Sequence, residues 1–178
     1  MVDVNCPWNV MQAIDFAQAW EAADIFWLEE PVWPPENFEG LSAVRRASQC
    51  AIAAGENAST AWEFARLFEA QAVDWAQPSV TKVGGITEML KIFALAETNN
   101  VKVVPHSPYF ASGFLATLQV MAARSDGQIP VERFHGTFEA NLFGDLIDIK
   151  GDGMLRIPEG PGLGCDPDPD VIREYRVE

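Results

Sequence analysis

Short runs of apolar residues alternate along the chain with longer segments in which apolar residues recur at helical spacing. The short runs predict β-strands, at residues 1–4, 25–28, 50–54, 73–77, 101–105 and 131–134. The longer segments predict α-helices, at residues 10–22, 38–48, 61–70, 86–99 and 113–123. Ser59 or Thr60 is suited to cap the third helix. Gly, Pro and Asp are frequent near the end of the chain and predict an irregular tail over about 140–178.

The spacing of the predicted strands narrows the fold class. Strands begin near residues 1, 25, 50, 73, 101 and 130, so each strand-and-helix unit takes about 25 residues. Such units are typical of α/β folds with parallel strands, either a barrel or a doubly wound sheet. A complete (β/α)8 barrel has eight units and about 250 residues, whereas this chain has 178. We therefore predict an incomplete (β/α)8 TIM-type barrel of about six units. Residues 1–178 would form its C-terminal part, with the first barrel strands absent and with open edges for a partner chain.

The composition excludes several classes of protein. The chain has 26 acidic and 12 basic residues and a net charge of -14, which argues against binding to nucleic acid. No segment approaches the roughly 20 apolar residues of a membrane span, and no signal peptide is recognisable. The three cysteines are far apart in the sequence, as expected of reduced thiols rather than a disulfide framework. These features predict a cytoplasmic protein.

Acidic residues follow three successive predicted strands. Asp3, Glu29 and Glu56 are 26 and 27 residues apart, which is the period of the strand-and-helix unit. In a parallel barrel the C-terminal ends of the strands share one face, where active sites lie. Three carboxylates at one point repel one another, and a divalent cation resolves the repulsion. Oxygen ligands favour Mg²⁺ or Mn²⁺ over zinc. The alternative is that these acids are ordinary loop residues or helix caps, and their neighbours Asn5, Glu30 and Asn57 are open to the same two interpretations.

Further candidate residues follow the later strands. Lys82 could meet a substrate anion, and the Gly84-Gly85 pair lets the backbone approach a ligand closely, although a turn with a solvated lysine is an equal alternative. His106 follows the fifth strand between prolines, which suits a general base, whereas a lone histidine is more often structural. His135 and Glu139 follow the last predicted strand and could reach the same face.

Five segments together resemble the mandelate racemase and muconate lactonizing enzymes of the enolase superfamily. They are Asp3-Val4-Asn5, Leu28-Glu29-Glu30-Pro31, Ala54-Gly55-Glu56-Asn57, the segment from Gln77 to Gly85, and Val104-Pro105-His106. The resemblance implies a barrel capped by a separate N-terminal domain that is absent from this chain. It also implies Mg²⁺ bound by Asp3, Glu29 and Glu56, and removal of the proton alpha to a carboxylate. His106 would then be the base, and Glu139 could donate a proton to the reacting group.

The sequence departs from this family at three places. The Lys-x-Lys pair of racemase-type sites belongs to an earlier strand, which is missing here. The residue that normally supports the histidine is an Asp, and Ser79 stands at that position. Asp74 does not replace it, because it lies at the opposite end of its strand. Gln77 stands near the position of the muconate-type base. A hydroxyl can orient an imidazole but cannot supply charge to raise its basicity.

These features favour an acid-sugar dehydratase, because losing one of two opposed bases impairs a racemase more directly. A racemase, epimerase or cycloisomerase of the same family is the first alternative. A second is a non-catalytic metal-binding fragment, and a third is an unrelated metal-dependent barrel such as an aldolase. The expected partners are a small carboxylate substrate such as an acid sugar, and either further copies of the chain or a complementing N-terminal portion. The 178-residue chain alone is expected to be inactive.

Overall fold

The computed structural model describes residues 1–124, 130–134, 136–144, 149 and 151–177. The chain divides into two compact units, Met1–His106 and Ser107–Glu178. The first unit contains five strands, β1 (Val2–Asp3), β2 (Leu28–Glu29), β3 (Ile52–Ala54), β4 (Trp75–Ala76) and β5 (Lys102–Val103). Its helices are α1 (Val10–Ala19), the 3-10 helix η1 (Glu21–Ala23), α2 (Phe38–Ala47), α3 (Ala61–Glu69) and α4 (Ile86–Thr98). The second unit contains α5 (Ser112–Arg124) and α6 (Pro169–Tyr175).

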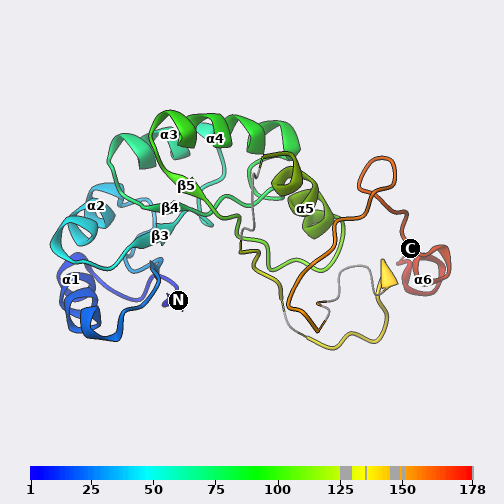
Figure 1. The fold of residues 1–178 in the computed structure, drawn as a ribbon, viewed down its shortest axis with the longest axis horizontal. Helices are drawn as coiled ribbons and strands as arrows, with labels where there is room; N and C mark the ends of the chain where they lie inside the picture. The colour runs from blue at the N-terminus through cyan, green and yellow to red at the C-terminus, as the bar shows by residue number, and fades with distance from the viewer. Residues whose placement is uncertain (125–129, 135, 145–148, 150, 178) are drawn as a thin grey trace. The chain divides into compact units, whose positions relative to one another are not determined.

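The five strands form one parallel sheet in chain order, β1-β2-β3-β4-β5. In the register of the sheet Asp3 is the partner of Glu29, and Glu29 is the partner of Ala53. Within the first unit each strand is followed by a helix, and helices α1 to α4 lie along one side of the row of strands (Figure 1). A parallel sheet in which neighbouring strands are consecutive in the chain confirms the predicted α/β fold.

Apolar side chains between the sheet and its helices form the core of the first unit. Leu28 and Ile52 of the strands have no exposed surface, and neither do Val44 of α2, Phe64 of α3 and Ile92 of α4. Burying one such side chain contributes about 1.5–3 kcal/mol to stability. These residues hold the strands in place, and so they fix the positions of the loops that follow the strand ends.

Helix starts in the first unit follow ordinary capping chemistry. Asn9 and Gln12 form a capping box at the start of α1, and Asn37 accepts a hydrogen bond from the backbone N–H of Gly40 in α2. Thr60 accepts from the backbone N–H of Glu63, which identifies it, rather than Ser59, as the cap of α3. All five predicted helices are confirmed, with bounds that differ by at most three residues.

The second unit differs from the sequence prediction in two places. Residues 131–134, predicted as the sixth strand, are not a strand. The backbone carbonyl of Glu132 instead accepts a hydrogen bond from the Ser107 hydroxyl at 2.7 Å. The tail predicted as irregular contains α6, because Asp168 accepts hydrogen bonds from the first backbone N–H groups and a proline occupies the first turn. Phe114, Leu115, Leu118 and Phe143 form the buried core of this unit.

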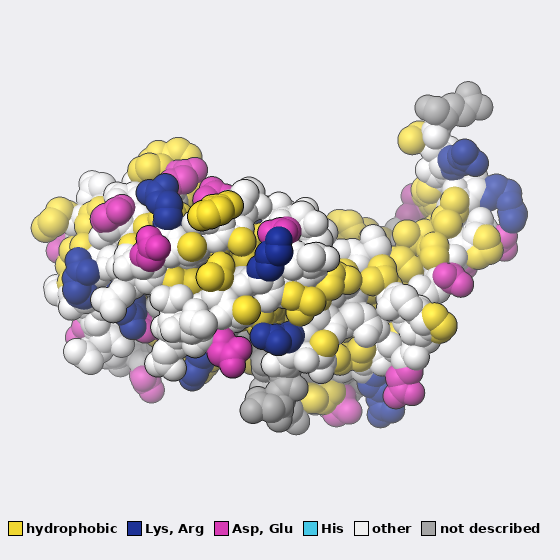
Figure 2. All heavy atoms as spheres, turned by 90° about the horizontal axis from the view of Figure 1, so that it is seen from above, with side chains coloured by type: hydrophobic (Ala, Val, Ile, Leu, Met, Phe, Trp, Pro, Cys, Tyr) yellow, Lys and Arg dark blue, Asp and Glu magenta, His cyan; other side chains and the backbone are white. Residues whose placement is uncertain are grey.

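The charged side chains mix on the surface. On the face seen in Figure 2, Lys and Arg side chains are interspersed with Asp and Glu. None of the helices in the described part of the chain has the length and apolar character needed to cross a membrane.

Candidate active site

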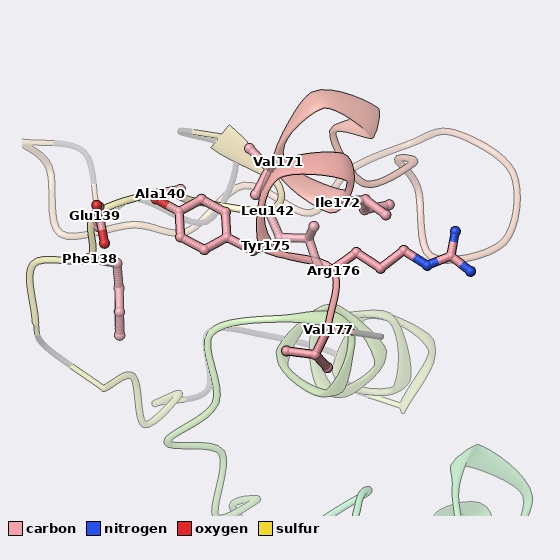
Figure 3. Close-up of a pocket in the computed structure, with 9 residues that line it drawn as sticks. All are labelled: Phe138, Glu139, Ala140, Leu142, Val171, Ile172, Tyr175, Arg176 and Val177. Atoms are coloured by element: carbon pink, nitrogen blue, oxygen red, sulfur yellow. The ribbon is translucent and has the colours of Figure 1, made fainter.

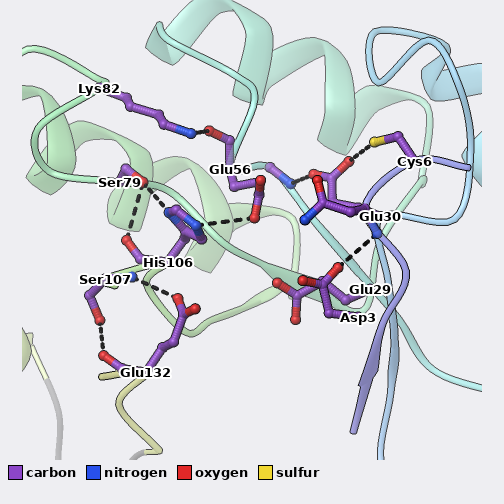
Figure 4. A network of polar contacts seen from close by, with 12 residues as sticks. Asp3, Cys6, Glu29, Glu30, Glu56, Ser79, Lys82, His106, Ser107 and Glu132 are labelled. Carbon is purple, nitrogen blue, oxygen red and sulfur yellow. Dashed lines mark hydrogen bonds and ion pairs between the residues drawn. The ribbon is translucent and has the colours of Figure 1, made fainter. Parts of the chain in front are cut away.

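The predicted metal ligands lie at the C-terminal ends of three neighbouring strands. Asp3 ends β1, Glu29 ends β2, and Glu56 follows β3 by two residues. Asp3 and Glu29 lie side by side, whereas the carboxyl group of Glu56 is turned toward His106 (Figure 4). Among the described residues, no three His, Cys, Asp or Glu side chains form a ready metal-binding group. The structure thus places the three acids at one end of the sheet without closing them around a point.

Glu29 is held by an aromatic residue of its own strand segment. Its side chain is buried, and the indole Nε1–H of Trp27 donates a hydrogen bond to Glu29 Oε2 at 3.0 Å. Trp27 in turn contacts the rings of Phe26 and Trp75. This hydrogen bond was not predicted from the sequence. Side chains two residues apart on an extended segment do, however, lie on the same face of the sheet.

A second buried carboxylate, Glu30, joins the three strand ends. It is only 2% exposed. Its Oε1 accepts from the backbone N–H of Gly55 at 2.9 Å, and its Oε2 accepts from the Cys6 thiol at 3.1 Å. The side chain of Asn57 also hydrogen-bonds to it. Burial raises the pKa of Glu30, and these hydrogen bonds partly offset the rise. Glu30 therefore supports the turn that carries Glu56.

The backbone around Glu30 adopts uncommon conformations. Asn5, Cys6 and Glu30 have φ values of 57°, 55° and 45°, in the left-handed region that non-glycine residues rarely occupy. Gly55 has a φ of 129°, a backbone conformation that glycine adopts readily and other residues rarely adopt. A Cβ at this position would lie 2.8 Å from the Phe64 ring. Such strain persists only where surrounding contacts hold it, and it concentrates at functional sites.

His106 and Glu56 contact each other directly. His106 Nε2 lies 3.1 Å from Glu56 Oε2, and both side chains are about one-eighth exposed, at 12% and 13%. Burial and the charge of Glu30 raise the pKa of Glu56 to about 7, an effect that Lys82 partly offsets. Burial and the charge of Lys82 lower the pKa of His106 to about 4. The distance between Nε2 and Oε2 would suit an ion pair, but both pKa shifts favour the neutral forms of the two side chains. We therefore describe the contact as a hydrogen bond between neutral groups at mildly acidic pH.

Ser79 supports the other side of the His106 ring. Its Oγ lies 2.7 Å from His106 Nδ1 and 3.1 Å from the His106 backbone carbonyl. The Ser79 hydroxyl thus contacts the imidazole in the way expected of a group that orients the ring. Asp74 lies at the other end of β4 and pairs with Arg45 at 2.8 Å. Asp74 is therefore a structural residue.

Lys82 lies at the same site. Its Nζ donates a hydrogen bond to the backbone carbonyl of Glu56 at 2.9 Å, and its side chain is exposed (Figure 4). The turn that carries Lys82 is fixed by two hydrogen bonds to the Ser79 carbonyl. Lys82 thus provides a cation beside Glu56 and His106, where a substrate anion could contact it.

The remaining predicted residues belong to the second unit. Glu139 is exposed and lines a pocket of about 690 Å³, together with Phe138, Ala140, Leu142 and residues of α6 and the segment after it (Figure 3). Its side chain hydrogen-bonds to Tyr175. Its predicted role as a proton donor remains a prediction. His135 lies outside the described residues.

The chemistry of the acidic group fits a hard divalent cation. The charges of Glu30, Asp3 and Glu29 all raise the pKa of Glu56, so these carboxylates share one electrostatic environment. Protonation of Glu56 and its contact with His106 relieve part of the repulsion. A cation with oxygen ligands would relieve it more completely.

Comparison with known proteins establishes the family. The family model described as enolase C-terminal domain-like matches residues 1–171. Haloferax volcanii D-xylonate dehydratase is 34% identical over 182 residues, covering 99% of this chain and 43% of that protein. Agrobacterium fabrum D-galactarolactone cycloisomerase is 31% identical over 186 residues, covering 99% of this chain and 49% of that protein. The chain belongs to the enolase C-terminal domain-like family.

A solved structure agrees with this assignment. L-Talarate dehydratase from Polaromonas sp. JS666, complexed with Mg and L-glucarate, superposes with a TM-score of 0.81 at 31% identity. The match covers 100% of this chain and 45% of that one. The predicted TIM-type barrel fold and the resemblance to the enolase superfamily are thereby confirmed. The chain spans less than half the length of the relatives it matches.

Proposed function

We propose that the protein carrying this chain is a Mg²⁺-dependent dehydratase of a small hydroxy acid, such as an acid sugar. The observation that carries the proposal is the 3.1 Å contact between His106 Nε2 and Glu56, which places a candidate base beside a candidate metal ligand. Two similar proteins that are named as dehydratases act on substrates of this class, D-xylonate and L-talarate, and the second was crystallised with Mg.

Asp3, Glu29 and Glu56 would hold the metal, with Glu30 supporting the loop of Glu56. Mg²⁺, when bound, would polarise the substrate carboxylate and offset the negative charge that develops beside it. Lys82 adds a second positive charge at the same end of the sheet.

His106 would remove the proton alpha to the carboxylate. Its lowered pKa keeps the imidazole neutral at physiological pH, so Nε2 can accept a proton. The electrons of the broken C–H bond form a carbon–carbon double bond as the β-hydroxyl leaves. The proton held on His106 can pass to that hydroxyl, which departs as water, and the resulting enol becomes a 2-keto acid. One base suffices for these reaction steps.

A cycloisomerase is the second candidate, favoured by the similarity to D-galactarolactone cycloisomerase. The two differ in their products, because a dehydratase releases a 2-keto acid and a cycloisomerase an isomer of its substrate. The test is to incubate the protein with Mg²⁺ and a panel of acid sugars and lactones, following keto-acid formation and the NMR spectrum of each mixture.

His106→Gln keeps a hydrogen-bonding side chain but removes the base. We expect it to lower kcat by about 10²–10⁴-fold, the usual contribution of a general base. Glu36→Gln, on an exposed residue away from the strand ends, is the matched control. Wild-type turnover in the His106 variant would refute the assigned base, and the absence of a keto product from every substrate would refute dehydration.

A further inference from the structure

The turn that carries Glu56 is tied to both neighbouring strand ends through the main chain of two adjacent residues. On the side of β2, the Gly55 N–H donates a hydrogen bond to Glu30 Oε1 at 2.9 Å. On the side of β4, the Glu56 carbonyl accepts a hydrogen bond from Lys82 Nζ, also at 2.9 Å. The strands lie in the order β2-β3-β4, so the two contacts hold the turn from opposite sides (Figure 4).

The main chain of Lys82 is itself fixed. Its backbone N–H and that of Val83 both donate to the Ser79 carbonyl at 3.0 Å. Val83 is buried, at 3% exposed, so this turn is also anchored in the core of the first unit. The lysine side chain therefore reaches the Glu56 carbonyl from a fixed point on the neighbouring strand end.

Lys82 could affect a cation at this site in two ways, which have opposite signs. If its charge decided, the ammonium group would repel Mg²⁺, and removing it would strengthen metal binding. If its hydrogen bond decided, removing it would loosen the turn of Glu56 and weaken metal binding. The Lys82 side chain is exposed, so solvent and salt screen the repulsion. The hydrogen bond acts directly on the main chain of the residue assigned as a ligand, and so we expect the second effect to be the larger.

We propose that Lys82 is a positioning residue that, opposite Glu30, clamps the turn of Glu56 and holds this ligand in place for the metal. The inference deepens the proposed function and rests on its assignment of Glu56 as a ligand. An ammonium group has three N–H donors, so Lys82 can keep this hydrogen bond while it also contacts a substrate anion.

The clamp is tested first without a metal, by amide hydrogen exchange of the metal-free chain followed by NMR. Lys82→Met keeps an unbranched side chain but removes the donor. The reporters are the Gly55 N–H, which is bonded to Glu30, and the Ala58 N–H, which donates to the Gly55 carbonyl at 3.1 Å. We expect both amides to exchange about 2–10-fold faster, the factor that corresponds to the net contribution of one hydrogen bond.

Lys91→Met is the matched control for this measurement. Lys91 is an exposed lysine of α4 that pairs with Glu88, and its loss removes the same charge from the same unit. We expect wild-type exchange at both reporter amides in this variant. Unchanged exchange in Lys82→Met, or an equal acceleration in Lys91→Met, would overturn the proposal.

Titration calorimetry with Mg²⁺ alone then tests the effect on the metal. We expect the Kd of Lys82→Met to be about 10–100-fold higher than that of the wild type, the usual effect of losing a group that orients a ligand. Lys82→Arg keeps a cation with N–H donors and should restore most of the affinity. An unchanged or lower Kd in Lys82→Met would overturn the proposal, because that is the sign expected of charge alone. If the wild-type chain binds no Mg²⁺ while the two amides respond as expected, the assignment of the metal site fails, whereas the clamp on the turn stands.

Discussion

The indole of Trp27 and the carboxylate of Glu29 are joined by a hydrogen bond of 3.0 Å beneath the end of the sheet. Both side chains are buried, at 5% and 8% exposed, so the bond is little weakened by water. A hydrogen bond to a buried carboxylate restricts its orientation, and such support commonly decides how well a metal ligand binds. Trp27 thus contributes to the site as well as to the core.

Trp27→Phe tests this support. The ring remains but the Nε1–H donor is lost, so we expect Mg²⁺ affinity to fall by about 10–100-fold, the usual effect of losing a group that orients a ligand. Isothermal titration calorimetry measures the affinity. Trp62→Phe is the matched control, because Trp62 is 84% exposed. Equal affinities for wild type and Trp27→Phe would show that the indole does not position Glu29 for the metal.

Glu56→Gln tests the proposed ligand set. The amide has nearly the same shape but no charge and binds Mg²⁺ poorly, so we expect binding to become undetectable by calorimetry. Glu36→Gln removes an acid from an exposed loop and should leave the affinity within about two-fold of wild type. A similar loss in both variants would indicate a diffuse acidic surface in place of a specific site.

The sequence predicted the parts of the site that follow from the spacing of the strands. It did not predict the parts that depend on individual side-chain contacts. The strand-and-helix period placed Asp3, Glu29 and Glu56 on one end of a parallel sheet, because consecutive parallel strands end on the same face. It also placed His106 there. The Cys6–Glu30 contact was not predictable, since it depends on left-handed backbone at both residues. The strand expected at 131–134 was wrong, and the Glu132 carbonyl in this segment accepts a hydrogen bond from the Ser107 side chain, a contact that the apolar pattern does not predict.

Glu30→Gln tests the buried support of the Glu56 turn. The amide retains one oxygen, so it cannot accept from both the Gly55 N–H and the Cys6 thiol as the carboxylate does. A buried group left without a partner costs about 1–3 kcal/mol, and we expect the free energy of unfolding to fall by about that amount. Urea denaturation measures it. Glu69→Gln, at an exposed helix end, should change stability by less than about 0.5 kcal/mol. If the Glu30→Gln and Glu69→Gln variants had the same free energy of unfolding, the Glu30 contacts would contribute little to stability.

The pH dependence of Mg²⁺ binding follows from the pKa of Glu56. This pKa is raised to about 7, so below that pH the carboxyl group carries a proton that a cation must displace. Apparent Mg²⁺ affinity should therefore fall as pH decreases, approaching a ten-fold loss for each pH unit well below about 7. Above that pH the affinity should level off. Because a ligand that binds only the folded state stabilises it, the Mg²⁺-induced rise in Tm should be larger at about pH 8 than at about pH 6. Thermal denaturation at both pH values, with and without Mg²⁺, checks the sign. A Tm rise that is the same at both values would mean that Glu56 does not release a proton on binding, and so is not a ligand.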